Sequence, residues 1–111
     1  MKMKKIIIST FILLGNFVFG QSLSEIIHNK NTILVDVRTK EEFNEGTAPN
    51  AIHIPLDSIE ARWEELKGNK NIVIFCKSGR RAEKAKEFLK SKGINAINGK
   101  NVENIKAELT K

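Results

Sequence analysis

The chain of 111 residues has one cysteine, no tyrosine, one tryptophan and two prolines. A single cysteine excludes an internal disulfide, so the packed core alone must hold the fold. The few aromatic residues are not interleaved with basic ones, which argues against a single-stranded nucleic-acid binder, and we expect no nucleic-acid partner. Cys76 and the widely separated His28 and His53 give no zinc-ligand spacing, so we expect no metal and no cofactor.

The first twenty residues have the pattern of a secretory signal peptide. Three lysines precede a nearly unbroken apolar run over 6–19, and the residues that follow allow cleavage before Gln21. This run is short for a membrane-spanning helix. We predict a signal peptide over 1–20, no stable membrane insertion after cleavage, and an exported protein that is periplasmic or secreted. An uncleaved N-terminal anchor is the alternative.

The net charge of the predicted mature protein also depends on whether these twenty residues are removed. The whole chain has 19 Lys and Arg against 13 Asp and Glu, a net charge of +6. Three of the lysines and none of the acids lie in 1–20, so residues 21–111 carry only +3. This modest excess gives little support to a nucleic-acid binder. The length leaves room for one domain, which we place at 21–111.

Strands and helices alternate along this domain. Apolar runs predict strands at 32–37, 52–54, 72–75 and 94–97. Alternation of this kind is typical of a parallel sheet covered by helices on both faces. We therefore expect an α/β domain with a parallel sheet of about five short strands. Capping residues and helical spacing predict five helices. The first is short and runs through about Asn29, and the second is brief and spans 40–44. A third begins at Asp57 and ends at Gly68, a fourth ends at Gly93, and a closing helix spans 102–109.

The single cysteine follows an apolar strand directly. Ile72–Phe75 leads into Cys76, and a loop with a glycine and three cations then leads into a helical pattern. Ligands of parallel sheets bind beyond the carboxyl ends of the strands, and free N–H groups at a helix start stabilise a thiolate. A lone cysteine after such a strand is most often an inert buried thiol. Cations at a helix N-terminus oppose the helix dipole, however, so stability alone does not favour them there. We predict that Cys76 is a nucleophile.

Two segments resemble one known family. Residues 76–81, CKSGRR, resemble the active-site loop of rhodanese-like sulfurtransferases in its C-x-x-G-x-R form. Residues 35–55, from VDVRTKEEF to PNAIHIP, resemble the family's first signature segment. Residues 98–101 differ from the family, in which a turn richer in glycine is often present.

The resemblance implies a two-step sulfur transfer. The Cys76 thiolate would take a sulfane sulfur from a small anionic donor such as thiosulfate and pass it to cyanide or a thiol, which can belong to a partner protein. It also implies a role in substrate binding for the rest of the loop and a supporting role for two residues at the neighbouring strand end. These residues are Lys77, Ser78, Gly79, Arg80 and Arg81 in the loop, and Asp36 and Arg38 at the strand end.

Three other functions compete with this interpretation. Cysteine-dependent phosphatases and arsenate reductases use C-x5-R, which would need an arginine where this chain has Ala82. A rhodanese-like module that only binds a partner would not need both the cysteine and the cationic loop. A persulfide carrier whose acceptor is a partner protein has the same sequence features as a free-standing enzyme.

Overall fold

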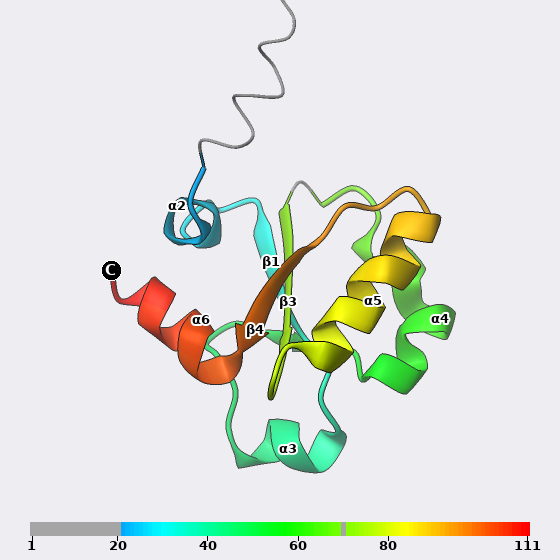
Figure 1. The fold of residues 1–111 in the computed structure, drawn as a ribbon, viewed down its shortest axis with the longest axis horizontal. Coiled ribbons are helices and arrows are strands. Elements are labelled where there is room, and N and C mark those ends of the chain that lie inside the picture. Colours follow the sequence, from blue (N-terminus) through cyan, green and yellow to red (C-terminus); the bar gives the residue numbers. More distant parts are fainter. Residues whose placement is uncertain (1–20, 70) are drawn as a thin grey trace, which may run out of the picture.

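A four-stranded parallel sheet forms the centre of the domain (Figure 1). The computed structural model describes residues 21–69 and 71–111, so the predicted signal peptide lies outside the described residues. The α/β class with a parallel sheet is confirmed, whereas the expected count of about five strands is one too high for the described residues. The strands, in the order β2-β1-β3-β4 across the sheet, are β1 (Thr32–Asp36), β2 (Ile52–His53), β3 (Asn71–Cys76) and β4 (Ile97–Asn101).

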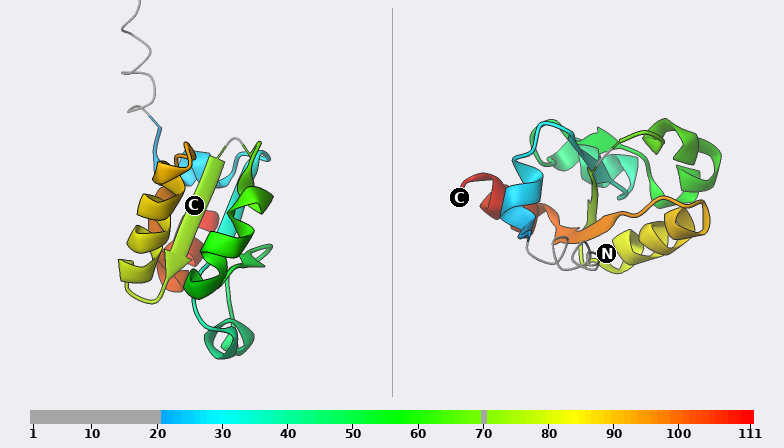
Figure 2. Two further views of the ribbon diagram at one scale, coloured as in Figure 1. Left: turned by 90° about the vertical axis from the view of Figure 1, so that its right-hand side faces the viewer. Right: turned by 90° about the horizontal axis from the view of Figure 1, so that it is seen from above.

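Helices cover both faces of the sheet, as expected from the sequence. Helices α2 and α6 pack on one face, and α4 and α5 pack on the other (Figures 1 and 2). Helix α3 lies apart from both layers, beyond the carboxyl ends of the strands (Figure 1). None of the helices in the described part of the chain is long and apolar enough to cross a membrane. The α-helices are α2 (Leu23–Ile27), α3 (Lys40–Glu45), α4 (Ile59–Arg62), α5 (Arg80–Ser91) and α6 (Val102–Leu109).

Two helix starts carry capping boxes, in which a hydroxyl and a carboxylate exchange hydrogen bonds with the backbone. Ser22 and Glu25 form one at α2, and Thr39 and Glu42 form the other at α3. The predicted helix from Asp57 is instead three short segments, with α4 between two 3-10 turns. These turns, η2 and η3, span Leu56–Ser58 and Trp63–Leu66.

Alternation along the strands sends apolar side chains to two separate core clusters. On β3, Ile72 and Ile74 point to the α4–α5 face, while Val73 and Phe75 point to the α2–α6 face. All four are at most 2 % exposed. Cys76 continues the first series, so its side chain lies on the α5 side of the sheet at the end of the strand.

Strand β4 lies later in the chain than the sequence predicts. A strand was expected at 94–97, but the structure has Ile97–Asn101, which includes the polar residues expected to form a turn. An edge strand tolerates polar residues because one side of its ladder is free. Any larger residue in place of Gly99 would force neighbouring side chains to move, since a Cβ would come within 2.6 Å of Ile105 Cδ1 and 2.9 Å of Val73 Cγ1.

Candidate active site

The Cys76 thiol lies in a ring of backbone N–H groups, formed where β3 leads into α5. Its Sγ accepts hydrogen bonds from the N–H of Gly79 at 3.0 Å and of Ala82 at 3.4 Å. Gly79 is the residue before α5 and has φ +99°, a left-handed conformation that glycine adopts without strain. This turn aims the unpaired amides of the first helical turn at the sulfur.

These amides make the thiol more acidic. Burial has the largest single effect and raises the pKa of Cys76, because it disfavours the thiolate. The N–H groups of Ala82 and Gly79, with those of Ser78 and Arg81, together outweigh burial and lower the pKa below its ordinary value. Cys76 is therefore a buried thiol whose charged form is stabilised.

The side chains of the loop play little part in this stabilisation. Lys77, Ser78 and Arg80 are exposed, and of these Lys77 alone lines the cavity above the sulfur. The Ser78 hydroxyl accepts a hydrogen bond from the N–H of Arg80 at 3.4 Å. The loop thus surrounds the thiol with backbone and directs most of its side chains outward.

Arg81 is held by a partner that the sequence did not reveal. Its guanidinium donates to both carboxylate oxygens of Glu42, at 2.7 and 3.1 Å. The guanidinium has the largest effect on the pKa of Glu42 and, together with the N–H and hydroxyl of Thr39, lowers it to about 2; the same ion pair raises the pKa of Arg81. The Thr39-x-x-Glu42 spacing signals a capping box, but nothing in it points to a residue 39 positions later.

Asp36 and Arg38 form a second ion pair at the end of β1, and this pair is buried. Arg38 donates to the Asp36 carboxylate from Nε at 3.0 and 3.1 Å and from Nη2 at 2.8 Å. The N–H of Arg38 and the hydroxyl of Thr47 add bonds of 2.9 and 2.7 Å to the same carboxylate. Arg38 Nη2 also donates to the carbonyl of Gly46, and the pair raises the pKa of Arg38. These bonds fix the segment that carries α3.

His53 packs between α3 and the turn after β1. Its ring stacks on Phe43 with the centroids 4.5 Å apart, and its Nε2 lies 2.7 Å from the carbonyl oxygen of Arg38. The side chain of His53 is half-buried in this position. The ring ties β2 to the turn after β1.

A cavity of about 140 Å³ opens next to the sulfur, and we call it the thiol cavity. Its lining includes Cys76 and Lys77 from the loop and Arg38 from the neighbouring strand end. The structure therefore brings together the predicted nucleophile and two of the other predicted site residues. Asp36 does not line the cavity and is ion-paired with Arg38, which does. Glu42, Glu45 and Glu103 complete much of the lining, and sequence reasoning had singled out none of them.

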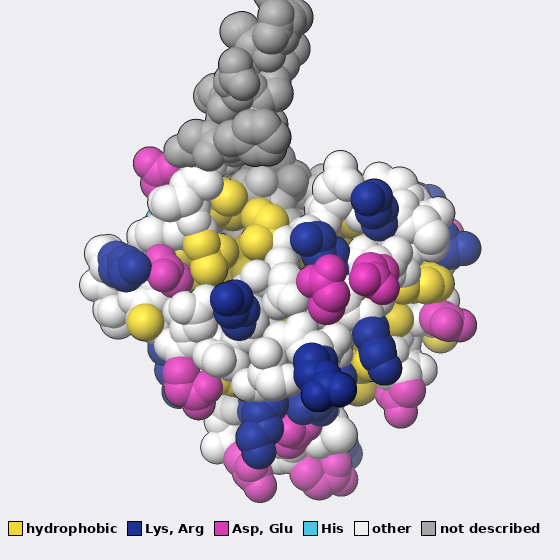
Figure 3. Space-filling view, in the orientation of Figure 1, with side chains coloured by type: hydrophobic (Ala, Val, Ile, Leu, Met, Phe, Trp, Pro, Cys, Tyr) yellow, Lys and Arg dark blue, Asp and Glu magenta, His cyan; other side chains and the backbone are white. Residues whose placement is uncertain are grey.

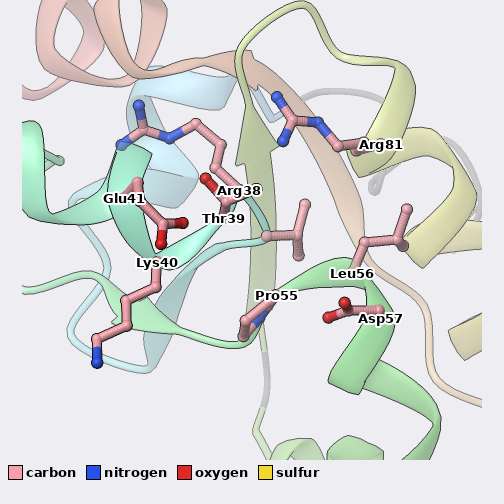
Figure 4. Close-up of a pocket in the computed structure, with 9 residues that line it drawn as sticks. Arg38, Thr39, Lys40, Glu41, Pro55, Leu56, Asp57 and Arg81 are labelled. Carbon is pink, nitrogen blue, oxygen red and sulfur yellow. The ribbon is translucent and has the colours of Figure 1, made fainter.

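A larger pocket of about 600 Å³, shown in Figure 4, shares Arg38 with the thiol cavity. Side chains from the start of α3, from the segment Pro55–Asp57 and from the start of α5 line it. Arg38 lines both cavities, and Arg81 lines the larger one while bonded to Glu42 of the smaller. The Arg81–Glu42 pair thus lies between them.

The surface around the site has mixed charge. Figure 3 shows acidic and basic side chains side by side at the end of the molecule where α3 lies. No continuous basic surface appears on this face of the described residues. Within residues 21–69 and 71–111, no group of three or more His, Cys, Asp or Glu side chains is placed to hold a metal ion.

Known proteins are similar to this chain in sequence and in fold. The chain is 31% identical over 83 residues to a sulfurtransferase of Allochromatium vinosum, covering 74% of this chain and 78% of that protein. It is 41% identical over 64 residues to the candidate sulfur carrier protein YrkF of Bacillus subtilis, covering 58% of this chain and 35% of that protein. Similarity to tRNA uridine(34) hydroxylases, such as that of Buchnera aphidicola, spans 31% of the longer protein.

Solved structures agree with the sequence comparison. A rhodanese-like domain protein from Staphylococcus aureus superposes with a TM-score of 0.62 at 31% identity, covering 84% of this chain and 83% of that one. The sequence profile of the rhodanese-like domain matches residues 20–106. With its parallel sheet, its thiol loop at the end of β3 and this match over most of its length, the chain belongs to the rhodanese-like domain family of sulfurtransferases and sulfur carriers.

Proposed function

We propose that the protein is a sulfurtransferase that carries a sulfane sulfur as a persulfide on Cys76. The observation that supports this most directly is the pair of N–H groups, from Gly79 and Ala82, that donate to Sγ. They lower the pKa of a thiol that burial alone would keep protonated. A thiolate is the nucleophilic form of cysteine, so the loop prepares the residue for attack on sulfur.

In the first half-reaction, the Cys76 thiolate attacks the outer sulfur of a donor such as thiosulfate. A bond forms between Sγ and the outer sulfur, and the S–S bond of thiosulfate breaks. Sulfite leaves with the bonding electron pair, and Cys76 becomes a persulfide. The same N–H groups stabilise the negative charge of the persulfide, as they stabilise that of the thiolate.

In the second half-reaction, cyanide or a thiolate attacks the outer sulfur of the persulfide. The new bond joins acceptor and sulfur, the bond to Sγ breaks, and Cys76 leaves as a thiolate. No external oxidant or reductant is needed, because the sulfur leaves the donor and reaches the acceptor in the same oxidation state. This scheme requires no metal and no cofactor.

The central test compares wild type with Cys76→Ser. Wild-type protein should transfer sulfur from thiosulfate to cyanide, and its intact mass should rise by one sulfur atom after treatment with thiosulfate alone. The Cys76→Ser variant should do neither. Equal transfer rates, or a wild-type protein that never gains sulfur, would show that the proposal is wrong.

A persulfide carrier that serves one partner protein is the second candidate, and the similarity to a candidate sulfur carrier favours considering it. The two candidates share the loading step and differ in the acceptor. Discharge that is slow into cyanide and small thiols, but fast into one purified protein, would favour the carrier. Robust turnover of a phosphotyrosine analogue would instead favour the phosphatase alternative.

We further propose that the domain acts outside the cytoplasm. The support is the signal-peptide pattern of residues 1–20 in the sequence. Expression of the full chain in a bacterial host should yield a periplasmic product whose mass corresponds to a start at Gln21. An oxidising compartment would make the reduction of Cys76, the single cysteine, part of its reaction cycle.

A further inference from the structure

The thiol cavity contains more negative than positive charge. Its lining includes three carboxylates, and two cations accompany them, Arg38 and Lys77. Arg38 is already paired with Asp36, and Glu42 is already paired with Arg81. The charged side chains of the lining that form no ion pair among the described residues are therefore Lys77, Glu45 and Glu103.

Glu45 and Glu103 reach the cavity from two different elements. Glu45 is the last residue of α3, and Glu103 lies in the first turn of α6. Both are exposed, and among the described residues neither forms an ion pair. Lys77 offsets one of the two, so the entrance to the thiolate remains negative.

This charge opposes the expectation that a cationic loop attracts an anionic donor. Of the three loop cations, Arg81 is neutralised by Glu42, and Arg80 does not line the cavity. A dianion such as thiosulfate must approach a thiolate past two unpaired carboxylates. Charge at the entrance of a cleft changes the encounter rate of charged reagents most strongly at low ionic strength.

We propose that Glu45 and Glu103 are specificity-determining residues, which select against small dianionic donors and for thiols that carry an ammonium group close to the sulfur. The inference depends on the proposed function, since it concerns the reagents of the same persulfide. The favoured acceptor class is aminothiols, whose ammonium group would lie between the two carboxylates while the thiolate attacks the outer sulfur. The products are an aminothiol persulfide and the Cys76 thiolate, and the acceptor proton passes to solvent.

The test measures discharge of the loaded protein into three thiols of similar length and different charge. Cys76 is loaded with excess thiosulfate, and loading is verified by intact mass. The acceptors are cysteamine, 2-mercaptoethanol and 2-mercaptoethanesulfonate, with rates expressed per thiolate. At low ionic strength we expect cysteamine to react fastest and the sulfonate slowest, with steps of about two- to five-fold. High salt should reduce the differences among the three discharge rates.

The variant Glu45→Gln/Glu103→Gln should likewise reduce the differences among the three discharge rates. It should also raise the rate of loading by thiosulfate about two- to five-fold. Glu87→Gln, which removes an exposed carboxylate on α5 outside the cavity lining, is the matched control and should leave both readouts unchanged. The single variants Glu45→Gln and Glu103→Gln should change the free energy of unfolding in opposite directions, which separates a structural effect from an effect on the reaction rates. An acid in the first turn of α6 is favourable to the helix dipole, and one at the end of α3 is unfavourable.

Two results would overturn the inference. One is a wild-type protein that discharges equally fast into all three thiols at low ionic strength. The other is a double variant that keeps the wild-type order and spacing of rates. Failure of Cys76 to gain sulfur from thiosulfate or from any other donor would instead contradict the proposed function itself.

Discussion

The two loops that meet at the thiol cavity are built from different groups. The thiol loop, residues 76–81, surrounds the sulfur with backbone amides and leaves most of its side chains in solvent. The β1–α3 loop, residues 37–39, is fixed by the side-chain pair Asp36–Arg38, with Asp36 fully buried. A backbone-built loop depends on its conformation, whereas a side-chain-built loop depends on the identity of each partner. Substitutions should therefore affect the two loops in different ways.

The largest effect is expected for Asp36→Ala, which leaves Arg38 without its carboxylate. Removing one partner of a buried ion pair costs about 3–5 kcal/mol in the free energy of unfolding. Urea unfolding at neutral pH measures this loss. Thr47→Ala removes a single hydroxyl donor to the same carboxylate and should cost only about 1 kcal/mol. If both variants lose the same small amount, the pair does not fix the loop.

Gly79→Ala should break the thiol loop through its conformation. At φ +99° an alanine is strained by about 1–2 kcal/mol, although its Cβ would meet nothing closer than 3.6 Å. Relaxation of this strain would move the Gly79 amide away from Sγ and raise the pKa of the thiol. The pH dependence of Cys76 alkylation reports that pKa.

Gly93→Ala is the matched control for this substitution. Gly93 has φ +80° and follows the far end of α5, and a Cβ there would meet nothing within 4 Å. It should lose similar stability with no change in the alkylation profile. An unchanged profile in Gly79→Ala as well would show that the amide does not control the thiol.

Glu42→Gln tests the ion pair that joins the two loops. Both side chains are about a quarter to a third exposed, at 25% for Glu42 and 32% for Arg81, so we expect a loss of about 1 kcal/mol at neutral pH. The pKa of Glu42 is lowered from 4.5 to about 2, so the stabilisation is complete above pH 4.5 and is lost as the pH falls towards 2.

The unfolding free energies of wild type and Glu42→Gln should therefore differ above pH 4.5 and converge near pH 2. Glu65→Gln, which breaks an exposed pair with Arg62 within one helical region, should give a smaller difference. A gap between wild type and Glu42→Gln that stays constant down to pH 2 would contradict the assignment to this carboxylate.

The smallest effect is expected for Ser78→Ala. It removes one exposed hydroxyl, whose bond to the Arg80 amide is 3.4 Å long. The backbone amide of Ser78 stays in place, so stability should change by less than about 0.5 kcal/mol and the alkylation profile should not move. A clear shift in that profile would show that side chains, and not only backbone, tune the thiol.

Local features of the fold were predictable from the sequence. The apolar runs of β1 and β3, the Thr39 cap of α3 and the position of Cys76 at a strand end follow from short-range patterns. Parallel strands also predict that Asp36 and Cys76 lie at the same edge of the sheet. Each of these features depends on residues close together in the chain or on a general rule of parallel sheets.

Features that depend on distant residues were not predictable. The Arg81–Glu42 pair joins residues 39 positions apart, and Glu45 and Glu103 converge from helices separated by most of the domain. Strand β4 was misplaced because the residues Asn98–Asn101 have the composition of a turn. Their pairing with β3 depends on the packing of Gly99 against Ile105, which only the assembled sheet reveals.

Gly99 also has a consequence for how the domain tolerates changes in length. In the pairing of β3 with β4, Ile74 lies opposite Asn98 and Phe75 lies opposite Lys100, so Gly99 is an extra residue between two successive pairs. Deleting it would close the bulge, leave Lys100 opposite Phe75 and remove the bend that the bulge introduces into β4 just before α6. Because Glu103 lies in the first turn of α6, we expect the deletion to displace this carboxylate at the thiol cavity and so to change the relative rates of the charged thiols, with no change in any ionisable side chain. Length, as well as composition, is thus under constraint in this segment.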